Sequence, residues 1–475
     1  MHDPRMPDTG RDVGAAARAR VIHSCPWLGL ALLVALRLPL LATGARDDDE
    51  GVYRLTLGWL GRAALYRDVY LSQPPVFPAL LVPWRTAAGE GLAADRAGVL
   101  LVAVTGSALA VLWLLRRAGP LTAALAAGAL ALDPSWLRAA TTLQAEGVAL
   151  GLALAGVGIA GLAGDGRRGR AVAAAAGAVL TAAVLAKLLA VPALVAAWVL
   201  LGGADGRARR GAAVAGAAAM AAIVAALLGS DMPAMLRQAV GLHLGARGTG
   251  LGGLDADFLQ AAAFELPIAA LAVAGGFRGR RRHSREAVAL IAWAAVAIPV
   301  TAVQNPLWPH HLAAIGVPLA ALVGFTAPVA TGRHRVGTRG SVALGAAAAL
   351  VAAGLVAELR LVRATPAAPA PALVRFLRDL PPGVTVVSDA EEAVAEAGRT
   401  TPPALVDTSF VRVLSGDLDP ATLRARLAAA APAVVVLATG RLERVPGFEA
   451  WLRAHSEPPV TVAGARIYTV SPVPG

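Results

Sequence analysis

Four consecutive acidic residues follow the first apolar segment of the chain, within the stretch RDDDEGVYRLTLGWLGRAALYRDVYLSQPPVF from Arg46 to Phe77. Membrane insertion does not require them, because topology is determined mainly by Lys and Arg in short loops. Asp47 and Glu50 have the capping-box spacing for a helix over Val52 to Leu65, where acids favour the N-terminus. Capping accounts for about two of the four carboxylates, so the others are candidates for a general base.

Further ionisable and polar residues lie within or beside apolar segments, where they are costly and are functional candidates by default. Glu146 lies about one turn into an apolar helix, where a carboxylate requires a partner or a water-filled cavity. Lys187, the only lysine of the chain, either extends to the membrane interface or binds a phosphate. The remaining candidates for donor-phosphate or substrate binding are Asp48, Tyr53, Gln73, Arg138, His243, His310 and His311.

The histidines have competing interpretations. His310 and His311 follow Trp308-Pro309 at the start of an apolar segment, which fits either an interfacial position or a hydrogen bond to a phosphate or sugar. We do not expect two adjacent histidines on one helix both to point inward, and the sequence has neither a Cys cluster nor HExxH. A zinc site is therefore not expected and no cofactor is predicted, although a divalent metal is not excluded. His243 lies in a Gly-rich loop and fits a structural or solvated position.

The composition indicates a polytopic, mainly α-helical membrane protein. The chain has 475 residues, of which 57% are hydrophobic and 16% are charged, and its mean hydropathy is +0.62. The net charge of +12 comes from short arginine clusters between apolar segments, which is typical of cytoplasmic loops rather than of nucleic-acid binding. The single cysteine, Cys25, excludes an intramolecular disulfide.

The hydropathy pattern predicts about eleven transmembrane helices. A proline-rich piece, Pro74 to Trp84, is too short to span and predicts an interfacial or re-entrant helix. If it does not cross, all five arginine clusters fall on the cytoplasmic side, together with a tail over residues 1–26. The acidic loop and the C-terminus are then extracytoplasmic. The predicted spans are Trp27–Ala42, Arg96–Leu115, Leu121–Leu132, Thr141–Leu162, Ala171–Lys187, Leu188–Leu201, Gly211–Leu228, Phe258–Gly275, Ala287–Val303, His311–Val329 and Ser341–Leu359.

After this transmembrane domain, residues 27–363, a Pro/Ala linker over residues 364–371 leads to a different kind of sequence. Strand and helix patterns alternate over residues 372–475, which predicts a small extracytoplasmic α/β domain. It has no Gly-rich phosphate loop. The expected strands are Val384–Ser388, Ala404–Val406, Ala433–Ala438 and Arg466–Val470, and the expected helices are Leu373–Leu380, Glu391–Ala397, Ala421–Ala430 and Phe448–His455.

Several of these motifs resemble the polytopic C-type (GT-C) glycosyltransferases, which include protein O-mannosyltransferases and lipid A aminoarabinose transferases. The resemblance covers roughly residues 27–360 and is most specific in the first loop, in Asp49-Glu50-Gly51-Val52-Tyr53, Leu65-Tyr66-Arg67-Asp68-Val69 and Gln73-Pro74-Pro75. It continues more weakly at Glu146, Lys187 and Pro309-His310-His311-Leu312. Where some relatives have a Lys before the Pro-Pro pair, this chain has Gln73.

The resemblance implies an enzyme of the plasma membrane that transfers a sugar from a polyprenyl-phosphate donor. The acceptor, a glycan, lipid or protein, is open. By the same resemblance Asp49 and Glu50 form the catalytic acidic pair, with Asp49 as the base, Glu146 as a second acid and Lys187 as a phosphate contact. The alternative is a multi-pass transporter or lipid flippase, although the internal repeats that transporters usually show are not evident here. Membrane lipids are also expected as partners, and nucleic acid is not. The C-terminal domain could bind the acceptor or a partner protein, or only cover the site.

Overall fold

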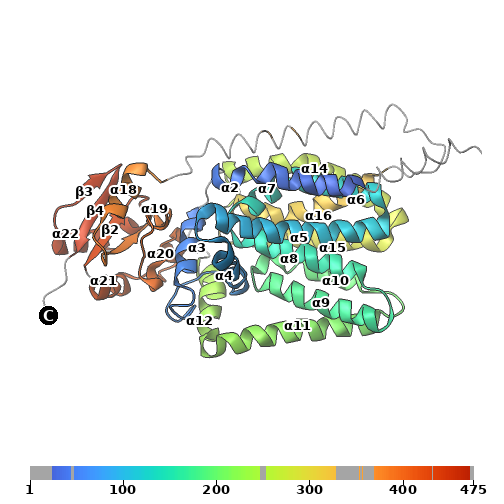
Figure 1. Ribbon diagram of the computed structural model, residues 1–475, viewed down its shortest axis with the longest axis horizontal. Coiled ribbons are helices and arrows are strands. Elements are labelled where there is room, and N and C mark those ends of the chain that lie inside the picture. The colour runs from blue at the N-terminus through green and yellow to red at the C-terminus, as the bar shows by residue number, and fades with distance from the viewer. Residues whose placement is uncertain are drawn as a thin grey trace, which may run out of the picture.

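The computed structural model describes residues 24–43, 48–246, 253–327, 352, 356, 369–430 and 432–470. Its larger part is a bundle of long helices, and a small domain lies against one end of that bundle (Figure 1). The bundle contains the segment Ser24–Ala42 and the helices α5 (Leu92–Ala118), α6 (Pro120–Leu132), α7 (Pro134–Thr141), α8 (Ala145–Leu162), α9 (Gly166–Val184), α10 (Ala193–Leu200), α11 (Gly206–Leu228), α14 (Ala256–Arg282), α15 (Ser284–Ala302) and α16 (Ala313–Val323).

Among the described residues, seven helices are long and apolar enough to cross a membrane, and Pro120–Leu132 and Leu188–Leu200 are shorter apolar helices. The expected count of eleven is therefore not confirmed, and the expected span Ser341–Leu359 lies outside the described residues apart from two positions. The predicted break near Lys187 to Pro192 is confirmed, because α9 ends at Val184 and a 3₁₀ turn, η1 (Leu188–Ala190), follows.

One predicted span is divided. The expected helix Thr141–Leu162 is interrupted at residues 142–144, where Thr142 and Gln144 have extended backbone conformations. The main-chain N–H of Leu143 donates to the Glu50 carboxylate at 2.6 Å, which satisfies a donor that the break removes from helical bonding. Glu146 consequently lies in the first turn of α8 instead of deeper in a longer helix.

Small residues hold the bundle together. A Cβ added to Gly106 of α5 would lie 1.9 Å from the carbonyl oxygen of Gly151 in α8, so these two backbones are in direct contact. Close approach through small residues replaces the hydrophobic effect as a source of helix association within a bilayer. At the bundle end away from the small domain, Arg117, Arg209 and Arg285 line one polar pocket. These members of three predicted cytoplasmic clusters therefore share one end of the bundle.

The first loop forms helices between the bundle and the small domain, as Figure 1 shows. Helix α3 (Asp48–Trp59) begins within the acidic run and ends earlier than the expected Leu65. Asp47 lies outside the described residues, so the proposed capping box is not tested. The proline-rich piece forms α4 (Val76–Ala88), which begins directly after Pro75; this confirms a separate helix there.

The small C-terminal domain has helices around a four-stranded sheet in the order β1-β2-β4-β3. β1 (Thr385–Ser388) and β2 (Ala433–Leu437) are parallel, whereas β4 (Ala465–Val470) runs antiparallel to β2 and β3 (Val460–Val462). The helices are α18 (Pro371–Asp379), α19 (Glu391–Glu396), α20 (Phe410–Leu414), α21 (Pro420–Ala430) and α22 (Phe448–His455). The expected strand Ala404–Val406 was wrong, because Pro403–Leu405 forms a 3₁₀ turn. Pro402 and Pro403 have no N–H group to donate to a neighbouring strand. Strand β3 was missed.

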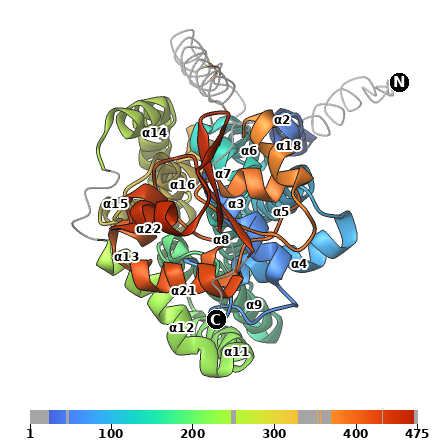
Figure 2. The ribbon, with the colours of Figure 1, turned by 90° about the vertical axis from the view of Figure 1, so that its left-hand side faces the viewer.

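The domain is joined to α3 by a shared hydrophobic cluster that includes Leu55, Val69 and Tyr70 from the first loop. Arg54 forms an ion pair with Glu392 at 2.7 Å. A Cβ on Gly51 would lie 2.3 Å from the backbone nitrogen of Glu392, so α3 and α19 approach through bare backbone. Viewed from the domain side, the C-terminal domain lies over α3 and α8 (Figure 2).

Candidate functional site

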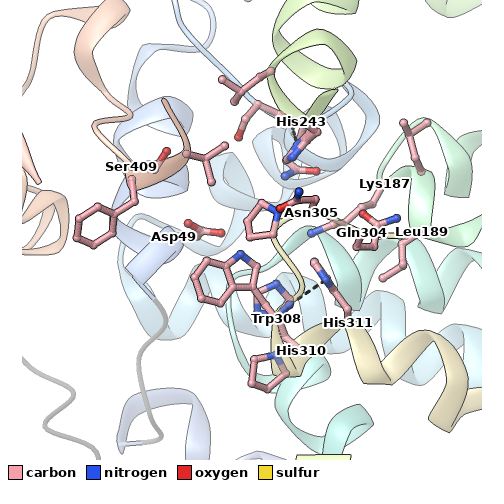
Figure 3. A pocket seen from close by; sticks show the side chains of 18 of the residues that line it. Asp49, Lys187, Leu189, His243, Gln304, Asn305, Trp308, His310, His311 and Ser409 are labelled. Atoms are coloured by element: carbon pink, nitrogen blue, oxygen red, sulfur yellow. Dashed lines mark hydrogen bonds between the residues drawn. The ribbon is translucent and has the colours of Figure 1, made fainter. Parts of the chain in front are cut away.

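A cavity of about 710 Å³ lies between the ends of the membrane helices and the C-terminal domain. Its wall combines residues from the first loop, from the helix breaks near Lys187 and His310, and from the C-terminal domain (Figure 3). The sequence candidates that line it are Asp49, Tyr53, Gln73, Arg138, Lys187, His243, His310 and His311. Residues from distant parts of the sequence therefore converge on one polar space.

Glu146 lies behind this wall and organises its cationic side. The carboxylate is 1% exposed and forms an ion pair with the Lys187 ammonium group. The same oxygen, Oε1, lies 3.3 Å from His310 Nε2 and 3.9 Å from His311 Nε2. Lys187 reaches this position because it lies in the break after α9 with an extended backbone. One buried acid thus holds three nitrogen-bearing side chains at the cavity.

The expectation that the two histidines diverge was wrong. Both ring Nε2 atoms face Glu146, and the rings are edge-to-face with centroids 4.6 Å apart. The segment Pro309–Leu312 is a 3₁₀ turn, η4, and His311 Nδ1 accepts the main-chain N–H of Trp308 at 3.3 Å, which turns this ring back toward the cavity. Glu146, His310 and His311 have ligand atoms within 4.8 Å of one another. They are a geometrically possible metal site, but the Lys187 ammonium already occupies the Glu146 oxygen.

Glu50 does not line the cavity, although the sequence places it beside Asp49. Its carboxylate is fully buried and accepts two hydrogen bonds from Arg96, at 2.6 and 2.8 Å. Because it also accepts the Leu143 N–H, it joins α3 to α5 and to the start of α8. The Glu50 carboxylate therefore faces the bundle core, and Asp49 is the carboxylate of this pair that lines the cavity. Asp48 is the first residue of α3, and its side chain lies outside the described set.

The neighbours of the first-loop candidates fix their positions. The ring of Tyr53 is 3% exposed and packs edge-to-face on Phe77 with centroids 4.8 Å apart. The backbone carbonyl of Gln73 accepts the Tyr66 hydroxyl at 2.7 Å, and burial raises the pKa of Tyr66, which keeps this donor protonated. His243 Nε2 lies 3.3 Å from the Ser72 carbonyl oxygen. This wall of the cavity is therefore ordered by packing and hydrogen bonds.

Sequence reasoning missed several cavity residues. The C-terminal domain contributes Asp407, Ser409 and Arg441, none of which was among the predicted site residues. Glu265 of α14 also lines the cavity, and the available signal was a lone carboxylate inside a predicted span.

No family model and no curated protein matches this sequence. Solved structures are nevertheless similar in fold. The structure of ArnT from Cupriavidus metallidurans bound to undecaprenyl phosphate matches with a TM-score of 0.70 at 16% identity, covering 93% of this chain and 97% of that one. The archaeal oligosaccharyltransferase AglB from Archaeoglobus fulgidus, in complex with an inhibitory peptide and a dolichol-phosphate, matches with a TM-score of 0.58 at 14% identity. That match covers 96% of this chain and 74% of AglB. At these identities the likeness is one of fold, and this chain has the GT-C fold of membrane glycosyltransferases.

Proposed function

We propose that the protein is a membrane glycosyltransferase that transfers a sugar from a polyprenyl-phosphate donor to an acceptor at the extracytoplasmic face. The observation that carries the proposal is the convergence of Asp49 and the Lys187–His310–His311 group on one cavity. Displacing a lipid phosphate from an anomeric carbon requires a base for the acceptor proton and cations for the departing phosphate. The cavity offers both kinds of group.

In this mechanism the acceptor oxygen or nitrogen attacks the anomeric carbon and loses its proton to Asp49. The bond between that carbon and the phosphate oxygen breaks, and the lipid phosphate leaves with the electron pair. Lys187 and the histidines stabilise the developing phosphate charge. Glu146 holds these groups in place before the reaction, so little reorganisation is needed. A single displacement of this kind inverts the configuration of the transferred sugar.

The position of the cavity is consistent with a lipid-linked donor. Apolar residues on its wall, including Leu188, Leu244 and Val303, are 41%, 54% and 64% exposed. They offer a surface to a polyprenyl chain at a bundle edge. The arginine end of the bundle is opposite the cavity, and the positive-inside rule assigns that end to the cytoplasm. The cavity and the C-terminal domain are then extracytoplasmic.

The test compares Asp49→Asn with Asp379→Asn, a matched change at an exposed aspartate of α18 outside the cavity lining. Both variants are reconstituted in proteoliposomes with radiolabelled undecaprenyl-phosphomannose and extracted cell-envelope acceptors. Loss of a general base lowers turnover by about 10²–10⁴-fold, so Asp49→Asn should lose transfer and retain donor binding. Unchanged transfer in Asp49→Asn would refute the proposal. The activity of a lipid flippase would likewise not depend on a general base at Asp49.

A further inference from the structure

We propose that a polar stripe on α14, ending at Glu265, binds the sugar carried by the donor through its hydroxyl or ammonium hydrogens. This inference rests on the proposed function and names a sugar subsite within the same cavity. The stripe consists of Asp257, Gln260, Ala261 and Glu265, which line the cavity at successive turns of one face. Glu265 lies well inside a helix long and apolar enough to span a membrane.

Glu265 has an oxygen without a hydrogen-bond partner among the described residues. Its side chain is 8% exposed, and Oε1 accepts the Ser135 N–H at 3.0 Å, whereas Oε2 accepts nothing. A buried carboxylate oxygen without a donor costs free energy. Because Glu265 lines the cavity, a ligand in the cavity can supply that donor.

A second carboxyl group, from Asp133, lies beside Glu265 and strengthens this requirement. Asp133 is fully buried, and its Oδ1 caps α7 by accepting from Ser135 Oγ and Trp136 N at 2.9 and 2.7 Å. Its Oδ2 accepts no hydrogen from a described N–H or O–H group, and the Asp133 and Glu265 carboxyl groups lie within hydrogen-bonding reach of each other. Two carboxylates cannot both remain ionised side by side without a hydrogen between them or a donor from outside.

No described cation supplies that hydrogen. Arg37 is buried nearby and interacts electrostatically with Asp133. Its Nη atoms donate to the main-chain carbonyls of Leu33, Leu130 and Ala131 instead. Neither Asp133 Oδ2 nor Glu265 Oε2 accepts a hydrogen bond from a described N–H or O–H group, so a hydroxyl or ammonium group of a cavity ligand would be the donor that this wall lacks. A phosphate, which offers oxygens, does not suit this wall.

The location favours the donor's sugar over other ligands. Phe258 of α14 packs with Leu307 and Leu312, so the stripe adjoins the η4 turn that carries His310 and His311. Those histidines belong to the proposed phosphate site. The group bonded directly to the phosphate of the donor is the sugar, which therefore meets the adjacent wall. Carboxylate and amide oxygens are hydrogen-bond acceptors for its hydroxyl groups.

The experiment measures the affinity of wild-type protein and Glu265→Gln, in nanodiscs, for three lipids: undecaprenyl phosphate, undecaprenyl-phosphomannose and undecaprenyl-phosphoglucosamine. The sugar-bearing lipids should bind the wild type more tightly than the bare lipid does. In Glu265→Gln, the affinity for the sugar-bearing lipids relative to the bare lipid should fall about tenfold, which corresponds to the loss of one charge-assisted hydrogen bond. The affinity for the bare lipid should not change.

Two controls separate folding from binding. Gln260→Ala alters an exposed side chain of the same stripe and should weaken sugar binding in the same direction without a folding defect. Glu286→Gln, at the arginine end of the bundle, should change nothing. The subsite is refuted if Glu265→Gln weakens bare and sugar-bearing lipids equally or leaves both unchanged. Failure of the wild type to bind undecaprenyl phosphate would instead overturn the proposed function.

Discussion

Removing Arg96 should destabilise the protein strongly, because it breaks a fully buried ion pair. Arg96 donates two hydrogen bonds to Glu50 and two more, each 3.1 Å long, to the carbonyls of Leu40 and Leu41. Arg96→Ala removes the guanidinium that pairs with the buried Glu50 carboxylate and leaves the hydrogen bond from the Leu143 N–H in place. Breaking a buried pair on one side costs on the order of 3–5 kcal/mol. At about 2 °C per kcal/mol for a large domain, Tm should fall by roughly 6–10 °C.

The assay follows tryptophan fluorescence during thermal unfolding in nanodiscs, at one heating rate because unfolding of membrane proteins is often irreversible. Arg453→Ala, which removes an exposed pair with Glu449, is the control and should leave Tm nearly unchanged. The double variant Glu50→Leu/Arg96→Leu should be less destabilised than the sum of its single changes, since neither charge is then left unpaired. If Arg96→Ala had the same Tm and turnover as the wild type, the idea that this ion pair fixes the position of α3 would be refuted.

Three further predictions concern other parts of the structure. Gly51→Ala should loosen the contact of the C-terminal domain with α3 and speed proteolysis of that domain, because the new Cβ would collide with the α19 backbone. Gly58→Ala on the same helix is the control: its new Cβ would have no atom within 4 Å, so the change should be tolerated. Burial raises the pKa of Glu391 above its ordinary value of 4.5, so the folded state holds this proton to higher pH than the unfolded chain does. The stability that this proton contributes should therefore fall as pH rises above 4.5. Glu391→Gln should flatten that part of a plot of Tm against pH. Because Lys187 occupies the Glu146 oxygen, EDTA should leave transfer unchanged, and a loss restored by Mn²⁺ would contradict that assignment.

Many residues of the candidate site could be identified from the sequence, because they are ionisable residues in apolar surroundings. Lys187 and Glu146 were identifiable for this reason, and their contact follows from two helix breaks at one level of the bundle. The direction of the Glu50 side chain was not predictable, because the type of a side chain does not show where it points. Only the position of Arg96, itself assigned to an ordinary span, shows that the carboxylate points into the core.

The histidine pair shows a second limit of sequence reasoning. The expectation of diverging rings assumed a regular α-helix, whereas Pro309 starts a 3₁₀ turn and a backbone N–H holds the ring of His311. Likewise, Asp407 and Ser409 reach the cavity through the docking of a separate domain, and no periodicity within the membrane segments encodes that docking. Local patterns therefore identified the membrane groups better than the soluble wall.

The acidic motif can be understood as a joint between three parts of the molecule. Successive residues of an α-helix point about 100° apart, so Asp49, Glu50 and Gly51 face three different directions. Asp49 lines the cavity, Glu50 binds Arg96 in the bundle core, and Gly51 lies against the α19 backbone. Each neighbour restrains a different direction of movement of α3. The position of the proposed base is consequently set by both domains together, and a change at either contact should alter turnover even though neither contact touches the substrate.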